Sequence, residues 1–433
     1  MKISLFQAIL LGVFSIGALM GLFVFATHTN NNSGGENDIG TVVIWGTLPK
    51  TSMDNVLSLA AQANEALKNL SYVQKSPSVL SSELASAIAT GVAPDLILAS
   101  QEELRSIAKY LSPIPLDMLS QATFTSTFIE EGDVFATNGG YYGIPFLVDP
   151  LVLFSNRDIL SSAGIARPPA TWEALTGLVP SVAQMTPARQ ITRGLIALGT
   201  YDNVRNARGI LSSLFLQQSI PISSYNNGGL GANIGSNTSS GQSPGKAVVG
   251  FYTQFADPSK VSYTWNASLQ SSDQMFLAGD LALYLGYASE ARYMTQGNPN
   301  LNFAVTALPQ PATAKFRNAY GLLYAFMIPR GAKNSSGAYQ SAEFFTTPTA
   351  QISSASATGL APSTLSQLAS VPDDPVAVVA YAEALYSRGW LSPMPADTDR
   401  VFSGMIRDVI SGRSSIDNAL ISAERSLTQL LQQ

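Results

Sequence analysis

The chain has 433 residues, of which 46% are hydrophobic and only 12% charged, and its formal net charge is −5. This length suggests two or three domains, and an acidic balance with no basic run gives no electrostatic support for a nucleic-acid partner. Cysteine is absent and His28 is the sole histidine. Disulfides, thiolate catalysis, His-based triads and zinc sites are therefore excluded, and we expect neither metal nor cofactor. Hydrolysis by paired carboxylates remains open.

The N-terminal segment is apolar. Residues 3–26 carry no charge, and at helical rise they would span about 36 Å, enough to cross a bilayer. A cleaved signal peptide has a shorter apolar core of roughly 7–15 residues, although the small side chains of Val24 and Ala26 would suit a signal peptidase. We expect residues 1–26 to form a transmembrane anchor, with a signal segment as the alternative. Residues 27–40 form a flexible tether, and the fold lies outside the cytoplasm, at the cell surface or in the periplasm.

Beyond the tether, strands and helices alternate. The β-prone run "TVVIW" (41–45) precedes residues at helical spacing (53–70), and "PDLILAS" (94–100) is a further buried strand. Alternation of this kind indicates a mostly parallel sheet covered on both faces. The pattern recurs over 194–287, which favours two α/β lobes over one large sheet. The Gly-, Ser- and Asn-rich residues 223–245 indicate an insertion or a disordered surface loop rather than a phosphate-binding loop.

The stretch "GYYGIPFLVDPLVLFSNRDILSSAGIARPPATWEAL" (140–175) resembles the extracellular solute-binding proteins of ABC importers, in the branch that includes maltose-binding protein. It contains a Tyr-Gly-Ile-Pro turn, an Asn-Arg-Asp step, Ala-Gly-Ile and Thr-Trp-Glu in the family's order. "APDLILAS", "FLAGDLALYLGY", "FAVTALPQP", "SATGLAPS" and the C-terminal "ISGRSSIDNALISAERSL" extend the resemblance over nearly the whole chain after the tether. The missing lipid-acceptor cysteine and the 223–245 loop depart from the family pattern.

The resemblance implies a two-lobed α/β fold of the periplasmic-binding-protein type, whose hinged lobes are joined by three crossings. The crossings are expected near 146–151, 303–308 and 344–350, which gives lobe 1 as 41–147 plus 306–346 and lobe 2 as 148–305 plus 347–433. It also implies a monomeric receptor, not an enzyme, that captures a small solute, first of all a sugar or oligosaccharide, and delivers it to an ABC permease. The alternatives are a ligand-sensing subunit of a signalling receptor and a carboxylate-dependent glycoside hydrolase.

Candidate ligand-binding residues follow strand ends, where open α/β sheets bind ligands. Asp149 lies between Pro145 and Pro150 on the first expected crossing, and a charge in such an apolar run must either be paired inside the protein or line a wet cleft. Tyr287 ends "LALYLGY" and matches the position where the family stacks an aromatic ring on its sugar. The other candidates come from strand ends and family-matched loops: Trp45, Thr47, Ser100, Glu102, Thr200, Tyr201, Trp265, Asn266, Asp399 and Arg400.

Several candidates have a structural alternative. Trp45 suits the core as well as the cleft, and Ser100 suits a helix cap. Trp265 could anchor its loop. Asp399 and Arg400 could form a surface ion pair, which would contribute little to stability.

Overall fold

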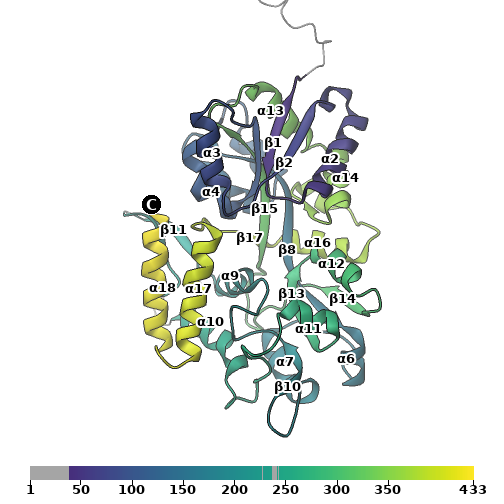
Figure 1. Cartoon of the computed structure of the whole chain (residues 1–433), viewed down its shortest axis with the longest axis vertical. Helices are drawn as coiled ribbons and strands as arrows, with labels where there is room; N and C mark the ends of the chain where they lie inside the picture. Colours follow the sequence, from purple (N-terminus) through teal and green to yellow (C-terminus); the bar gives the residue numbers. More distant parts are fainter. Residues whose placement is uncertain (1–38, 227, 237–240, 242) are drawn as a thin grey trace, which may run out of the picture.

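The computed structural model describes residues 39–226, 228–236, 241 and 243–433, and it shows two α/β lobes stacked along the longest axis (Figure 1). Two α/β lobes were expected, and they are present. The apolar segment 1–26 and nearly all of the tether lie outside the described residues. Within the described ranges, no helix combines the length and the apolar character needed to cross a membrane.

The part of the chain before the first long strand forms most of the upper lobe in Figure 1. Its elements are β1 (Val42–Gly46), α2 (Lys50–Ala63), η1 (Glu65–Leu67), β2 (Leu70–Gln74), α3 (Leu80–Ala89), β3 (Leu96–Ser100), α4 (Gln101–Ile107), η2 (Ala108–Tyr110), β4 (Leu111–Ser112), β5 (Ile114–Pro115), α5 (Gln121–Thr127), η3 (Glu130–Phe135), β6 (Ala136–Thr137) and β7 (Gly140–Tyr141). β1 pairs in parallel with both β2 and β3. This is the predicted β-α-β beginning, in which α2 buries Met53, Val56, Leu57 and Ala60 at helical spacing.

The middle of the chain forms most of the lower lobe and begins with the long strand β8, which runs through both lobes. It comprises β8 (Ile144–Asn156), α6 (Arg157–Ser162), α7 (Trp172–Gly177), α8 (Val179–Val182), β9 (Gln184–Met185), β10 (Ile191–Ile196), α9 (Ala207–Gln217), β11 (Ser223–Asn226), β12 (Gly229–Ala232), α10 (Pro244–Thr253), η4 (Gln254–Ala256), α11 (Ser272–Ala278), β13 (Leu281–Tyr287), α12 (Glu290–Gly297) and β14 (Phe303–Thr306). Part of the predicted surface loop 223–245 is therefore the hairpin β11–β12, which is tied to the C-terminal helix by a hydrogen bond from Ala232 N to Thr428 Oγ1.

The last part of the chain contributes to both lobes. It comprises β15 (Ala319–Pro329), α13 (Ser335–Phe344), α14 (Pro348–Thr358), β16 (Ala361–Pro362), α15 (Leu365–Leu368), α16 (Pro375–Ala384), β17 (Ser387–Arg388), α17 (Pro395–Ile410) and α18 (Ile416–Leu431). α14 packs against α2 of the upper lobe, whereas α17 and α18 pack on each other and on α9 and α10 of the lower lobe.

One sheet runs through both lobes. Its strand order is β2-β1-β3-β15-β8-β13-β10-β9, so the lobes do not have separate sheets as the sequence pattern suggested. The reason is the length of β8, whose 13 residues are all buried. Its first half pairs with β15, from Ile144 opposite Phe326 to Pro150 opposite Gly321, and its second half pairs with β13.

The pairings of β8 show where the chain crosses from one lobe to the other. The first expected crossing, 146–151, lies within β8. The second was expected near 303–308, but β14 pairs there with the second half of β8, and Gln310 then hydrogen-bonds residues 170 and 172 of the lower lobe. The strand that runs beside β8 through the middle of the molecule is β15. Motifs in the sequence could not show that β15 connects the lobes, because its position depends on its pairing with β8 in the folded chain.

Candidate functional site

A cavity of about 380 Å³ lies where β13, β15, α9 and α17 meet. It is lined by Tyr201, Asp202, Val204, Asn206, Ala207, Arg208, Gly209, Tyr287, Leu322 and Asp399. The structure thus brings together three predicted residues, Tyr201, Tyr287 and Asp399, from distant parts of the chain. Two aromatic rings beside convergent charged groups are the usual composition of a small-molecule site.

Arg208 is the centre of a charged cluster at this cavity. Its Nε and Nη2 atoms donate to the two carboxylate oxygens of Glu102 at 2.8 and 2.7 Å, and Nη1 donates to Asp399 at 2.6 Å. Tyr201 donates its hydroxyl to Asp399, and Tyr320 donates to Glu102. Burial by itself would lower the pKa of Arg208, but the two carboxylates outweigh it and raise that pKa well above its ordinary value. The guanidinium therefore stays charged.

Asp149 has a partner inside the protein. Its carboxylate accepts hydrogen bonds from the backbone N–H of Ser289 at 3.1 Å and from the Ser289 hydroxyl at 2.6 Å. Burial raises the pKa of Asp149 to about 7, although the bonds from Ser289 act in the opposite direction. Asp149 also lies within electrostatic reach of Tyr287, whose pKa is raised well above its ordinary value by burial and then by Glu102 and Asp149. Asp149 also lies opposite Leu322 on β15, and Leu322 and Tyr287 both line the cavity, so Asp149 is next to this site.

The candidates at the ends of β1 and β3 have local contacts in the upper lobe. Trp45 is half-buried, with Lys75 Nζ 3.9 Å from its ring centroid, and Thr47 N donates to the Leu98 carbonyl. Ser100 caps α4: its hydroxyl oxygen accepts from the N–H of Glu102, within a capping box. The predicted helix cap is thus present, and none of these side chains lines the 380 Å³ cavity.

Thr200, Trp265 and Asn266 gather around Asn203 instead. Thr200 and Trp265 both donate to the Asn203 side-chain oxygen, and the Asn203 amide donates to the Asn266 carbonyl. Trp265 is fully buried. Trp265 therefore anchors its loop, which is the structural alternative that the sequence left open.

Asp399 and Arg400 do not pair with each other. Asp399 pairs with Arg208, whereas Arg400 is exposed and pairs with Asp397 at 2.8 Å, three residues before it. Consecutive residues of a helix point in different directions, so on α17 only Asp399 faces the cavity.

Four residues at or beside the cavity were not predicted from the sequence: Arg208, Asn206, Leu322 and the buried Tyr320. The sequence predicts a strand over 194–200, and Arg208 comes eight residues after its end, which is too far for the strand-end rule. Leu322 and Tyr324 alternate on β15, where both are only half-buried. The alternation is in burial only: β15 reads AYGLLYAFMIP, an almost continuous apolar run, so no pattern in the sequence marked the face that turns toward the site.

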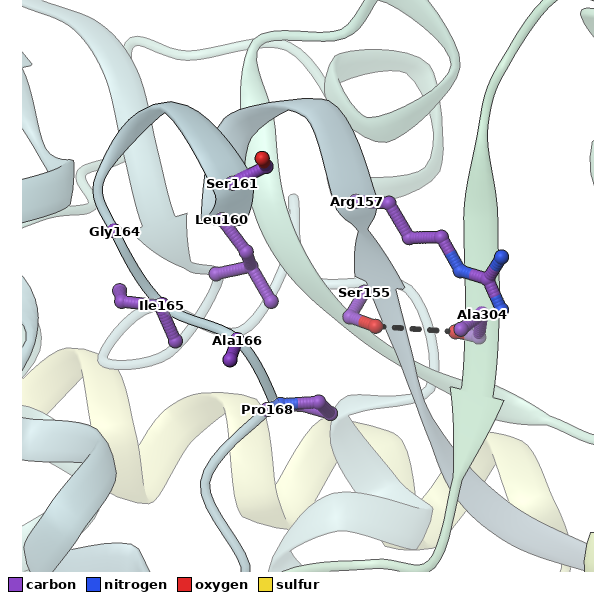
Figure 2. A pocket seen from close by; sticks show the side chains of 9 residues that line it. All are labelled: Ser155, Arg157, Leu160, Ser161, Gly164, Ile165, Ala166, Pro168 and Ala304. Atoms are coloured by element: carbon purple, nitrogen blue, oxygen red, sulfur yellow. Dashed lines mark hydrogen bonds between the residues drawn. The ribbon is translucent and has the colours of Figure 1, made fainter.

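A second cavity, of about 540 Å³, lies in the lower lobe beside α6 and β14 (Figure 2). Figure 2 shows Ser155 donating a hydrogen bond to the Ala304 carbonyl at 3.3 Å, with Arg157 nearby as the one charged side chain. Leu160 and Ile165 supply apolar surface. This cavity is larger than the first, but it contains no aromatic residue and no predicted site residue, so we place the candidate site at the cavity beside Arg208.

The two-lobed fold, with a candidate small-molecule site where α9, α17, β13 and β15 meet, is the architecture of a solute-binding protein. Residues 61–380 match the family described as bacterial extracellular solute-binding protein. The chain belongs to this family, which confirms the resemblance inferred from residues 140–175. No curated protein sequence matches the chain.

Solved structures share the fold at low sequence identity. The cyclic alpha-maltosyl-1,6-maltose binding protein from Arthrobacter globiformis has a TM-score of 0.73 at 15% identity, with 91% of this chain and 99% of that chain covered. The sugar-binding protein MalE from Xanthomonas citri has a TM-score of 0.69 at 17% identity, with 91% and 98% covered. The maltose-maltodextrin binding protein of Alicyclobacillus acidocaldarius has a TM-score of 0.66 at 18% identity, with 91% and 100% covered.

Proposed function

We propose that this chain is the extracytoplasmic receptor of an ABC transport system, which captures a sugar or short oligosaccharide between its lobes and delivers it to a membrane permease. The observation that carries the proposal is the cavity itself, where Tyr287 of β13, Arg208 of α9 and Asp399 of α17 converge. The structural neighbours that bind maltose-type sugars support it. Residues 1–26 would hold the receptor at the membrane.

The cavity residues suit a sugar chemically. A sugar ring has an apolar face, which packs on an aromatic face such as that of Tyr287 or Tyr201. Its hydroxyls donate to carboxylates and accept from guanidinium groups. The hydrolase alternative gains no support, because Asp149 is bonded to Ser289 and Glu102 to Arg208.

A thermal-stability screen of the full-length protein tests this function. The panel contains maltose- and mannose-based oligosaccharides, monosaccharides, polyols, polyamines and peptides. A solute that binds only the folded state stabilises it by about 2.7 kcal/mol at a hundred times its Kd. We expect a sugar to raise the melting temperature. A rise with polyamines or peptides alone would refute the sugar assignment, and no rise with any solute would refute the receptor.

The site is tested by Tyr287→Ala in the presence of the sugar that the screen identifies. Loss of a stacking ring should weaken binding about tenfold, which corresponds to about 1.4 kcal/mol. Tyr225→Ala is the matched control, because Tyr225 is an exposed tyrosine on the β11–β12 hairpin and lines no part of the cavity. Titration calorimetry measures both variants. Equal affinities for the two would place the site elsewhere.

A further inference from the structure

The ion pair between Glu102 and Arg208 joins the two lobes. Glu102 lies in the first turn of α4, which packs on α3 and β3 of the upper lobe, and Arg208 lies in the first turn of α9, which packs on α10 and α17 of the lower lobe. Both helices also pack on β15, the strand that runs through the middle of the molecule. In Figure 1, α4 is at the lower end of the upper lobe and α9 is at the upper end of the lower lobe. The two hydrogen bonds between these side chains, at 2.8 and 2.7 Å, therefore connect the lobes directly.

Both ends of the pair are held in place. Glu102, with 4% of its side chain exposed, also accepts a hydrogen bond from Tyr320, and the Ser100 capping box fixes the turn on which it lies. Arg208, with 21% of its side chain exposed, also donates to Asp399 of α17. A fork-shaped guanidinium bonded to both carboxylate oxygens tolerates little displacement. Separation of the lobes by a few ångström would break both bonds together.

We propose that the Glu102–Arg208 pair is an interlobe latch, which holds the lobes together in the absence of solute and must open for solute to enter. Opening returns both charges to water, and this hydration offsets part of the lost attraction. The latch is therefore a reversible contact that sets the fraction of open receptor. The latch deepens the proposed receptor function and rests on it in one respect, namely that the lobes open to admit a solute. Its test needs no solute, so failure of the sugar screen and failure of the latch are distinguishable.

The distance between the lobes can be measured by double electron–electron resonance on the full-length chain. Because the sequence contains no cysteine, Val92→Cys in the upper lobe and Val261→Cys in the lower lobe, both exposed, supply the only two labelling sites. Without solute, we expect the latched protein to give mainly one short distance. Arg208→Met and Glu102→Gln should each lower that population at least fivefold and replace it by longer, broader distances.

Arg205→Met is the matched control. Arg205 is three residues from Arg208 and pairs with Asp273 at 2.8 Å, within the lower lobe. Its loss removes an arginine ion pair but no contact between lobes, so the distance distribution should not change. Melting temperatures identify any variant that fails to fold, and Glu102→Gln keeps the shape of the side chain if Arg208→Met unfolds. Short distances that persist in both latch variants would overturn the proposal, as would equal opening by Arg205→Met.

Discussion

Asp149 accepts hydrogen bonds from the backbone and hydroxyl of Ser289, so its charge is compensated at the point where β8 meets the loop after β13. It lies opposite Leu322 of β15, which lines the cavity, so Asp149 is next to the candidate site. The sequence offered two interpretations, a structural pair and a ligand-binding acid. The hydrogen bonds from Ser289 support the structural role. The ligand-binding role stays a prediction, which the position of Asp149 next to the cavity supports.

Asp149→Asn separates the two roles. If Asp149 accepts hydrogen bonds from solute hydroxyls, the variant should bind the sugar at least tenfold more weakly, a loss of about 1.4 kcal/mol. Its melting temperature near pH 8 should be unchanged or higher, because burial disfavours the ionised carboxylate that the variant removes. Calorimetric titration and thermal unfolding measure the two effects.

Ser289→Ala is the companion variant, because it removes only the structural partner of Asp149. It should lower the melting temperature, since a buried carboxylate then loses a hydrogen bond. A destabilised Asp149→Asn protein with undiminished affinity would exclude Asp149 from the binding site.

At the level of elements, α9 fits closely against the strand that carries Tyr287. A methyl group at Gly209 would lie 2.6 Å from Tyr287 Oη and 3.3 Å from a ring carbon of Tyr320. Alanine favours a helix over glycine by about 0.5–1 kcal/mol, but overpacking typically costs about 1–3 kcal/mol. Packing should therefore outweigh helix propensity here.

We expect Gly209→Ala to be destabilised by about 1 kcal/mol and to bind solute more weakly, because the Tyr287 ring must move. Gly404→Ala is the matched control on α17, where an added methyl group meets no atom within 4 Å. It should be stabilised by about 0.5–1 kcal/mol with unchanged affinity. Denaturant unfolding and calorimetry measure both variants. A gain in stability for Gly209→Ala would show that the cleft wall tolerates the methyl group.

For the whole molecule, buried acids dominate the pH dependence of stability. Burial raises the pKa of Asp149, Glu383 and Glu103 to about 7, and for Glu103 the charge of Glu102 adds to the effect. Burial also raises the pKa of Glu131 well above its ordinary value, and neither Glu131 oxygen has a hydrogen-bond partner among the described residues. In the unfolded chain such acids titrate near 4. Between pH 4 and 7 the folded protein therefore binds more protons.

The free energy of unfolding should accordingly fall as pH rises through this window and level off above about pH 7. Between pH 5 and 7.5 we expect a loss of about 2 kcal/mol or more, measured by denaturant unfolding. Glu131→Gln should lose less over the same interval. Asp257→Asn, which changes a partly exposed acid whose pKa is lowered by hydrogen bonds from Ser259, should behave like the parent. Stability that is constant or rises between pH 5 and 7.5 would contradict this prediction.

The sequence by itself determined the alternation of strands and helices and the solute-binding family, and it predicted Tyr287 and Asp399 as site residues, which the structure places at one cavity. These features depend on local periodicity and on motifs that short stretches carry. Only the tertiary structure decided that Glu102 pairs with Arg208, 106 residues away, and that Asp399 joins them from 191 residues away. It likewise decided that β15 runs beside β8. Charge pairing and strand pairing depend on which surfaces meet after folding, and no local pattern in the chain records that.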